Sequence, residues 1–371
     1  MRRKLRPWRP VMLKLLWLIP LAVWGFCWPR ILEGRSAWVE TNYAGRIYPT
    51  IRNAASVLTS LVPISVAELV LYALVLFACW EVLAGLIRWA AHRTTLPKYL
   101  SSLLSLALLA AVLLNLFFVT WGFNYFREPL AKRMGLTVKA RSVEELSALV
   151  ERLSGEASAL RETLPEDENG VFRLSNGVQP MLDAMLEAYE ALSARLPVFG
   201  GRVTRAKRVL WSEGLSYLGI AGIFVGFTGE PNVNVHQPDL LLPQGAAHET
   251  AHQLGIASEN EAEFAGYLAC QASDDPCVRY SGLMLALLHC GNALAKADPG
   301  RYYTLAAAYG PGLTADFVDY NAYWDRYEGE LSESADRVND AYLKFNAQQS
   351  GVKSYGESVD LLLAYYEQTN N

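Results

Sequence analysis

The residues best suited to chemistry are two histidines and a glutamate in the run His248-Glu249-Thr250-Ala251-His252, which has the form H-E-x-x-H. On a helix, histidines four positions apart project from one face and can bind one tetrahedral zinc ion. Glu249 is turned by about 100° from His248, so it can reach a water beside the zinc without binding the metal. The motif predicts a catalytic zinc site with metal ligands His248 and His252 and the general base Glu249. Packing or solvation of the same side chains is the purely structural alternative.

A catalytic zinc ion needs a third protein ligand and an open fourth position. The metzincin spacing would place a third histidine at position 258, which is Ser258, so that subclass is disfavoured. Two glutamates follow, Glu259 and Glu261, and each is a candidate metal ligand. Glu261 has a competing role, because Ser258 and Glu261 have the spacing of a helix capping box.

The motif needs a short helix to position it, and the flanking residues predict one. Pro243 lies before the motif and Gly255 after it, as is typical of the first and last turns of a helix. We therefore expect about three helical turns, followed by a second helix from about Ser258.

The segment from Ser258 to Tyr267 resembles the glutamate helix of gluzincin peptidases, whose membrane-embedded examples carry E-x-E-A-D with the first glutamate on the metal. This resemblance implies that Glu259 is the third ligand and that Glu263 steadies a ligand histidine from outside the coordination sphere. The spacing departs from most gluzincins, because Glu259 follows His252 by only seven positions. A tight turn at Gly255 would have to bring the two helices together.

A wider resemblance covers nearly the whole chain. Its features are three apolar N-terminal segments, the motif followed by Gln253-Leu254-Gly255, and four further runs: Gly222-Ile223-Phe224, Phe227 to Asn234, Asn339 to Lys344 and Ser354-Tyr355-Gly356. Together they look like an uncharacterised bacterial family of membrane-anchored, metallopeptidase-like proteins. The resemblance implies a zincin-like fold and a suspected peptidase activity, without an established substrate.

Two further elements would complete a peptidase site. The segment Asn232 to His236 alternates polar and apolar residues, which predicts an edge strand on which a peptide could add, or an ordinary edge strand with a polar face. An oxyanion donor should face the zinc opposite Glu249. Tyr355 is the preferred candidate because Ser354 and Gly356 place it in a break between helices, and the alternatives are Arg337, Tyr323 and His289.

Three apolar segments, at about 11–28, 64–87 and 100–123, are each close to the 20 residues that cross a bilayer as a helix. A cleavable signal peptide is the alternative for the first segment, but no small-x-small site follows it cleanly. The first 140 residues hold 17 basic and 5 acidic residues, and the remainder hold 16 and 32. We therefore expect a membrane domain over residues 1–123 and a soluble domain over residues 124–371.

Basic residues before the first segment and between the second and third predict a cytoplasmic N-terminus. An odd number of crossings then places the soluble domain on the outer face of the cytoplasmic membrane. On that face Cys270 and Cys277 could form a disulfide. The composition, 52% hydrophobic and 19% charged, excludes a disordered chain and a polycation that coats nucleic acid, so no nucleic-acid partner is expected.

The predicted fold is mainly helical with a small sheet, a zincin-like α+β domain after three transmembrane helices. The predicted function is a membrane-anchored zinc peptidase, with the bilayer and a peptide or protein substrate as partners. Two alternatives remain. One is a catalytically inactive membrane scaffold or receptor that keeps the fold, which the intact base Glu249 argues against; the other is a zinc hydrolase of a non-peptide envelope substrate.

Overall fold

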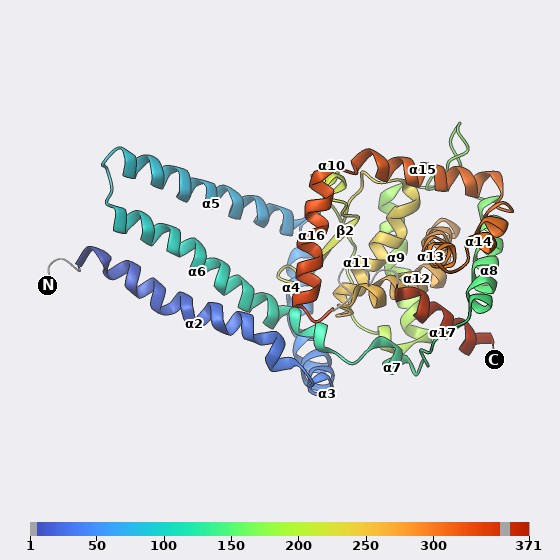
Figure 1. Cartoon of the computed structure of the whole chain (residues 1–371), viewed down its shortest axis with the longest axis horizontal. Helices are drawn as coiled ribbons and strands as arrows, with labels where there is room; N and C mark the ends of the chain where they lie inside the picture. The colour runs from blue at the N-terminus through green and yellow to red at the C-terminus, as the bar shows by residue number, and fades with distance from the viewer. Residues whose placement is uncertain (1–5, 349–356, 371) are drawn as a thin grey trace.

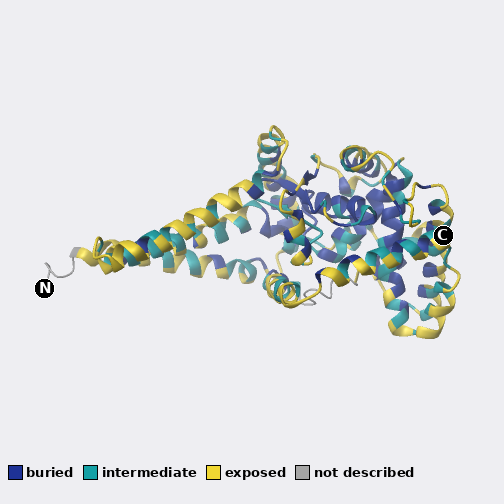
Figure 2. Cartoon of the chain, turned by 90° about the horizontal axis from the view of Figure 1, so that it is seen from above, coloured by how far each residue is buried: buried dark blue, intermediate teal, exposed yellow. Residues whose placement is uncertain are grey.

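Three long helices project from one side of the molecule, and the rest of the chain forms a body at their ends (Figure 1). The computed structural model describes residues 6–348 and 357–370. The long helices are α2 (Arg9–Leu32), α5 (Val66–Ala90) and α6 (Leu96–Thr120), and each is long and apolar enough to cross a membrane. They match the three predicted segments with bounds that differ by a few residues, because helical hydrogen bonding continues past the apolar run. Their side chains are largely exposed, as lipid-facing side chains would be (Figure 2).

The segment between α2 and α5 is helical as well, which the sequence did not lead us to expect. It follows the short 3₁₀ turn η1 (Arg6–Trp8) and α2, and it contains α3 (Ser36–Trp38), the π-helix η2 (Val39–Ile47) and α4 (Tyr48–Ser60). The α2 end nearest the N-terminus and the α5–α6 turn lie together, away from the body (Figure 1). The segment 33–65 and the described residues after α6 lie at the opposite ends of these helices.

The body is built mainly from helices around one apolar core. The helices α8 and α9 each bury one apolar face in this core, and α8 begins with a capping box formed by Ser142 and Glu145. The helix α13 packs on α8 and α12, and α12 packs on α11 and α9. In chain order the helices of the body are η3 (Gly122–Phe126), α7 (Leu130–Met134), α8 (Val143–Arg161), α9 (Val178–Arg195), η4 (Pro197–Phe199), α10 (Ser212–Tyr217), η5 (Asp239–Leu241), α11 (Leu242–Gln253), α12 (Glu259–Ala272), α13 (Pro276–Ala297), α14 (Pro299–Ala306), α15 (Pro311–Tyr327), α16 (Glu330–Phe345) and α17 (Ser358–Asn370).

A three-stranded sheet has the order β1-β3-β2, formed by β1 (Lys207–Arg208), β3 (Glu230–Val233) and β2 (Gly222–Val225). β1 runs parallel to β3, and β2 runs antiparallel to it with Ile223 opposite Asn232. The prediction of an edge strand over Asn232 to His236 is therefore wrong, because β3 is the central strand and β2 is an edge. The polar side chains of β3 are buried inside the protein, where Asn232 Nδ2 donates to the carbonyls of Ile223 and Glu230.

The sheet is fastened to the first turn of α5 by buried charge. Glu230 accepts hydrogen bonds from the amides of Val66 (3.2 Å) and Ala67 (2.9 Å) and pairs with Lys207. Lys207 Nζ also donates to the carbonyls of Thr59 (2.7 Å) and Ile64 (3.0 Å). A carboxylate at a helix N-terminus is stabilised by the free amides there, so the pairing fixes α5 on the sheet.

All five cysteines are free, so Cys270 and Cys277 do not form the disulfide considered from the sequence. Cys270 lies inside α12, where its Sγ donates to Gln244 Oε1 at 3.3 Å. Cys277 lies in the first turn of α13 beside the hydroxyl of Ser175. The two thiols are thus held in separate buried environments.

Replacing Lys207 with methionine should destabilise the protein. The variant leaves the buried Glu230 carboxylate without its cation, and removal of one partner from a buried pair costs about 3 kcal/mol in free energy of unfolding. The check is thermal unfolding of the full chain in detergent, with Lys132→Met as control, because Lys132 forms an exposed pair with Glu128. Equal melting temperatures for the two variants would contradict this account.

Candidate metal centre

The motif lies on α11 and presents its two histidines on one face. Pro243 occupies the first turn, and the helix ends at Gln253, close to the predicted bounds. The rings of His248 and His252 lie one helical turn apart, with centroids separated by 4.7 Å. Both side chains are buried.

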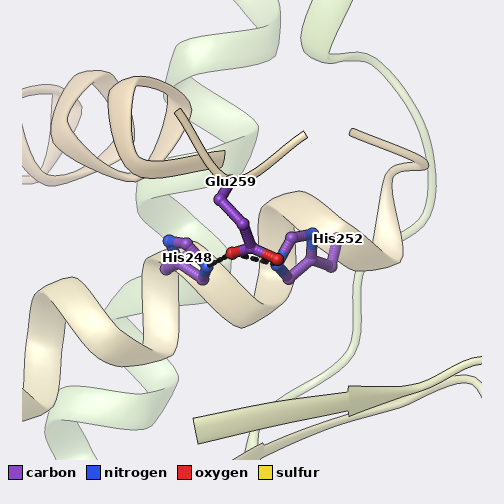
Figure 3. Close-up of side chains that lie close together, drawn as sticks. All are labelled: His248, His252 and Glu259. Atoms are coloured by element: carbon purple, nitrogen blue, oxygen red, sulfur yellow. Dashed lines mark hydrogen bonds and ion pairs between the residues drawn. The ribbon is translucent and has the colours of Figure 1, made fainter. Parts of the chain in front are cut away.

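A tight turn returns the chain over α11 and delivers Glu259. Gly255 adopts φ +80°, and a β-carbon there would lie 2.9 Å from Asn124 Oδ1 and 3.0 Å from Tyr48, so glycine is required on both counts. Glu259 is the first residue of α12, and its Oε2 lies 3.1 Å from His248 Nε2 and 3.5 Å from His252 Nε2 (Figure 3). One carboxylate thus faces both imidazoles.

The Nδ1 atom of each imidazole ring also has a hydrogen-bond partner. His248 Nδ1 lies 3.2 Å from Glu263 Oε2, and His252 Nδ1 lies 2.7 Å from the carbonyl of Ile256. Such partners fix the ring orientation and leave Nε2 directed at a metal. Glu263 is in turn held by Gln244 Nε2 at 3.1 Å and lies 3.4 Å from His289 Nε2.

The charges of this group depend on one another. Burial alone would lower the pKa of His248, but hydrogen bonds to Glu259 and Glu263 outweigh it and hold that pKa well above its usual value. Burial opposes ionisation of Glu259 and Glu263 as well, yet their histidine partners keep both carboxyl pKa values well below the usual range. In the metal-free protein a proton on His248 therefore offsets one of the two buried negative charges.

Glu249 lies on the same helix but outside this cluster. It is buried, its Oε2 has no hydrogen-bond partner among the described residues, and burial raises its pKa to about 7. The Glu249 side chain packs against Gly222 of β2. A β-carbon at Gly222 would lie 2.7 Å from Glu249 Cγ and 2.8 Å from Glu249 Oε1, so only glycine leaves room for this side chain. A buried carboxyl with one unpaired oxygen and a pKa near neutrality is suited to accept and return a proton.

The residues present fit a bound metal ion. One ligand atom each from His248, His252 and Glu259 lies within 4.8 Å of the other two, and all three residues are buried. Two imidazoles and a carboxylate are a donor set that zinc prefers, and three protein ligands leave one position open. The unpaired oxygen of Glu249 lies on the same helix.

Other residues considered from the sequence lie elsewhere. Glu261 turns away from the group and accepts a hydrogen bond from the amide of Leu130, and Ser258 makes no cap bond to α12, so the predicted capping box is wrong. Arg337 lies on the exposed surface of α16, and the Tyr323 hydroxyl pairs with Ser216 at 2.5 Å. His289 approaches the group only through Glu263. Tyr355 lies outside the described residues.

Residues that follow α2 and α6 in the chain also hold the motif helix, which sequence reasoning missed. Trp121, which follows α6, donates to the carbonyl of His252 at 3.1 Å, and the two rings lie 5.9 Å apart. Tyr48 donates to the carbonyl of Gln253 (2.8 Å) and Arg127 to that of Gly255 (3.0 Å). The aromatic run after α6 signalled a membrane boundary, but no local pattern connected it to the motif.

Fold and site define a mainly helical protein with three helices of membrane-spanning length and a buried His-His-Glu group at their ends. The chain belongs to the family DUF3810, described as proteins of unknown function, whose profile matches residues 43–363. The matched region includes α5, α6 and the whole candidate metal centre. No curated protein and no solved structure matches the chain.

Glu259 and Glu261 lie two positions apart, so replacing each one in turn distinguishes loss of a metal ligand from loss of a nearby negative charge. Glu259→Gln should lower zinc affinity by at least about a hundredfold, because an amide is a much weaker zinc donor than a carboxylate. Glu261→Gln is the matched control, since its amide oxygen can still accept from Leu130. Zinc content after dialysis against a weak chelator measures both variants, and equal retention would refute the assignment.

Metal affinity should rise with pH. Because the pKa of His248 in the metal-free protein lies well above 6.5, its proton is bound at neutral pH and has to leave when metal enters. The apparent affinity should therefore increase by about tenfold per pH unit for one displaced proton, until pH exceeds that pKa. Calorimetric titration with zinc in buffers of different ionisation enthalpy measures the released proton; pH-independent binding would contradict the charge balance.

Proposed function

We propose that the chain is a membrane-anchored, zinc-dependent peptidase. The observation that carries the proposal is the convergence of two imidazoles and one carboxylate in a buried position, with Glu249 beside them. His248, His252 and Glu259 would hold the metal. When bound, a zinc ion polarises a carbonyl group and lowers the pKa of its bound water to about 7, so that the water can lose a proton at neutral pH.

The protein's own residues supply the proton chemistry. Glu249 accepts the proton that the attacking water loses, and it returns that proton to the amine that leaves when the peptide bond breaks. Its neighbours support this role, because burial disfavours the charged form and holds the pKa near neutrality. Glu263 and the carbonyl of Ile256 keep the histidine rings from turning.

The sheet supports a peptide substrate. β2 pairs with β3 on one side only, and it lies beside Glu249 at Gly222. An extended peptide could add to its other side as a further strand, which is how an open sheet edge recognises peptides. A motif helix packed on a small sheet with its edge strand beside the general base is the arrangement we infer to be zincin-like.

The membrane helices support a second candidate function, hydrolysis of a non-peptide envelope substrate. Trp121, at the end of α6 nearest the body, contacts His252. This contact supports access to the candidate metal centre for molecules at a membrane surface. The bias of basic residues supports a cytoplasmic N-terminus, which would place this centre on the outer face of the cytoplasmic membrane.

Glu249→Gln should keep the metal and lose hydrolysis. The amide cannot accept the water proton, so the rate should fall by at least about a hundredfold while zinc content stays unchanged. The experiment compares the full-length protein with the variant on a broad peptide library and on lipid-linked envelope material, with zinc measured in the same samples.

The results distinguish the candidates. Cleavage of peptides that is lost in the variant supports the peptidase, and turnover confined to envelope material supports the second candidate. Bound zinc with no turnover of either would favour the inactive scaffold or receptor. A variant as active as the parent protein would remove Glu249 from the mechanism.

A further inference from the structure

The helix α16 has an apolar stripe along one side. Its members recur at helical spacing: Leu331, Ala335, Val338, Tyr342 and Phe345. The opposite side carries most of the charged residues: Glu333, Asp336, Arg337, Asp340 and Lys344. Such a two-sided helix needs an apolar neighbour along its whole length.

The described part of the protein covers only one end of this stripe. Val338 is 71% exposed and Leu331 is 56% exposed, whereas Phe345 is partly buried. The side of α16 that faces the body is a different one, marked by the buried Leu343. A stripe of large exposed apolar side chains on a helix that already has a packed side and a charged side marks an interaction surface.

The covered end of the stripe packs against the membrane helices. The ring of Phe345 lies 5.7 Å from Phe26 of α2 and 6.0 Å from Phe118 of α6, and Tyr342 lies 6.1 Å from Phe117. These partners belong to the last turns of α2 and α6 before the body. Figure 1 shows α16 running across the ends of the long helices instead of along them.

We propose that α16 lies in the bilayer interface, with lipid covering Leu331 and Val338. The C-terminal end of the apolar stripe contacts α2 and α6. Because α16 runs across these helices, the N-terminal end of the stripe lies at the same depth, where lipid would surround them. A helix in this position buries its apolar face at the boundary of headgroups and acyl chains and keeps its polar face in water. Tyr342, between the two parts, is the residue type that settles at this boundary.

The charged side indicates what kind of attraction holds the helix. Glu333, Asp336 and Asp340 outnumber the basic residues Arg337 and Lys344 on this side. Electrostatic attraction to anionic lipids would therefore add little, and burial of the apolar stripe provides the binding. Zwitterionic lipid should be sufficient.

The position of α16 has a consequence for the candidate metal centre. Just beyond its C-terminus, Gln348 accepts a hydrogen bond from the amide of Glu259 at 3.4 Å and donates to the carbonyl of Ala257 at 3.3 Å. A helix held in the interface is thus hydrogen-bonded, through Gln348, to the turn that presents Glu259. The proposal itself concerns α16 and the lipid, and it stands whether or not the centre is catalytic.

The test measures the depth of single positions on α16 in the full-length protein. Val338→Cys is labelled with an environment-sensitive fluorophore in a background carrying Cys27→Ala and Cys79→Ala, since the other three cysteines are buried. The protein is placed, one chain per disc, in phosphatidylcholine nanodiscs that contain lipids with a nitroxide near the headgroup. Asp336→Cys is the matched control, because this exposed residue points to nearly the opposite side of the helix.

Quenching by nitroxide lipid should be several-fold stronger at position 338 than at position 336, and Leu331→Cys should behave like Val338→Cys. Equal quenching at 336 and 338, or none at either, would overturn the proposal. A fluorophore at position 338 could also report an apolar environment without being quenched by nitroxide lipid, and only in discs that hold several chains. That result would assign the stripe to contact with a second copy and would also overturn the proposal.

Discussion

The candidate centre depends on one carboxylate oxygen that faces two imidazole nitrogens in a buried position. Glu259 Oε2 lies 3.1 Å from His248 Nε2 and 3.5 Å from His252 Nε2. Burying a carboxylate and two imidazoles is costly unless each polar atom has a partner, and here a shared proton or a metal ion can satisfy all three. The fold around the centre follows from this requirement. The helix α11 aligns the two rings, the turn at Gly255 reverses the chain, and α12 begins with the carboxylate.

Residues that follow the long apolar helices α2 and α6 in the chain belong to the same arrangement. Trp121, Tyr48 and Arg127 donate to the carbonyls of His252, Gln253 and Gly255, at the end of α11 and in the turn after it. The last carbonyls of a helix have no amide partner one turn further on, and these side chains supply additional hydrogen bonds there; the His252 carbonyl also accepts from the Gly255 amide. Glu230 and Lys207 join α5 to the sheet in a comparable way. The centre is therefore positioned by contacts from both the body and the membrane helices.

Sequence patterns predicted the helices that are specified by residues close together in the chain. The apolar segments and the motif helix depend on residues a few positions apart. The edge strand was mispredicted because β1, which covers one side of β3, and Lys207, which pairs with Glu230, belong to a part of the chain more distant in sequence. The polar side chains of the segment are therefore buried, whereas their alternation with apolar residues indicated an exposed face. The choice between Glu259 and Glu261 likewise needed a tertiary contact, the bond of Glu261 to the Leu130 amide. The role of Tyr355 stays a prediction.

Zinc K-edge X-ray absorption of the full-length protein, purified without chelator, tests the central claim most directly. The account predicts retained zinc with two imidazole nitrogens and a carboxylate oxygen at about 2.0–2.2 Å, together with one exchangeable oxygen and no sulfur. In His252→Ala one imidazole should disappear from the spectrum. Protein that holds no metal when zinc is supplied, or a spectrum with thiolate sulfur or with imidazole scattering unchanged in His252→Ala, would contradict it.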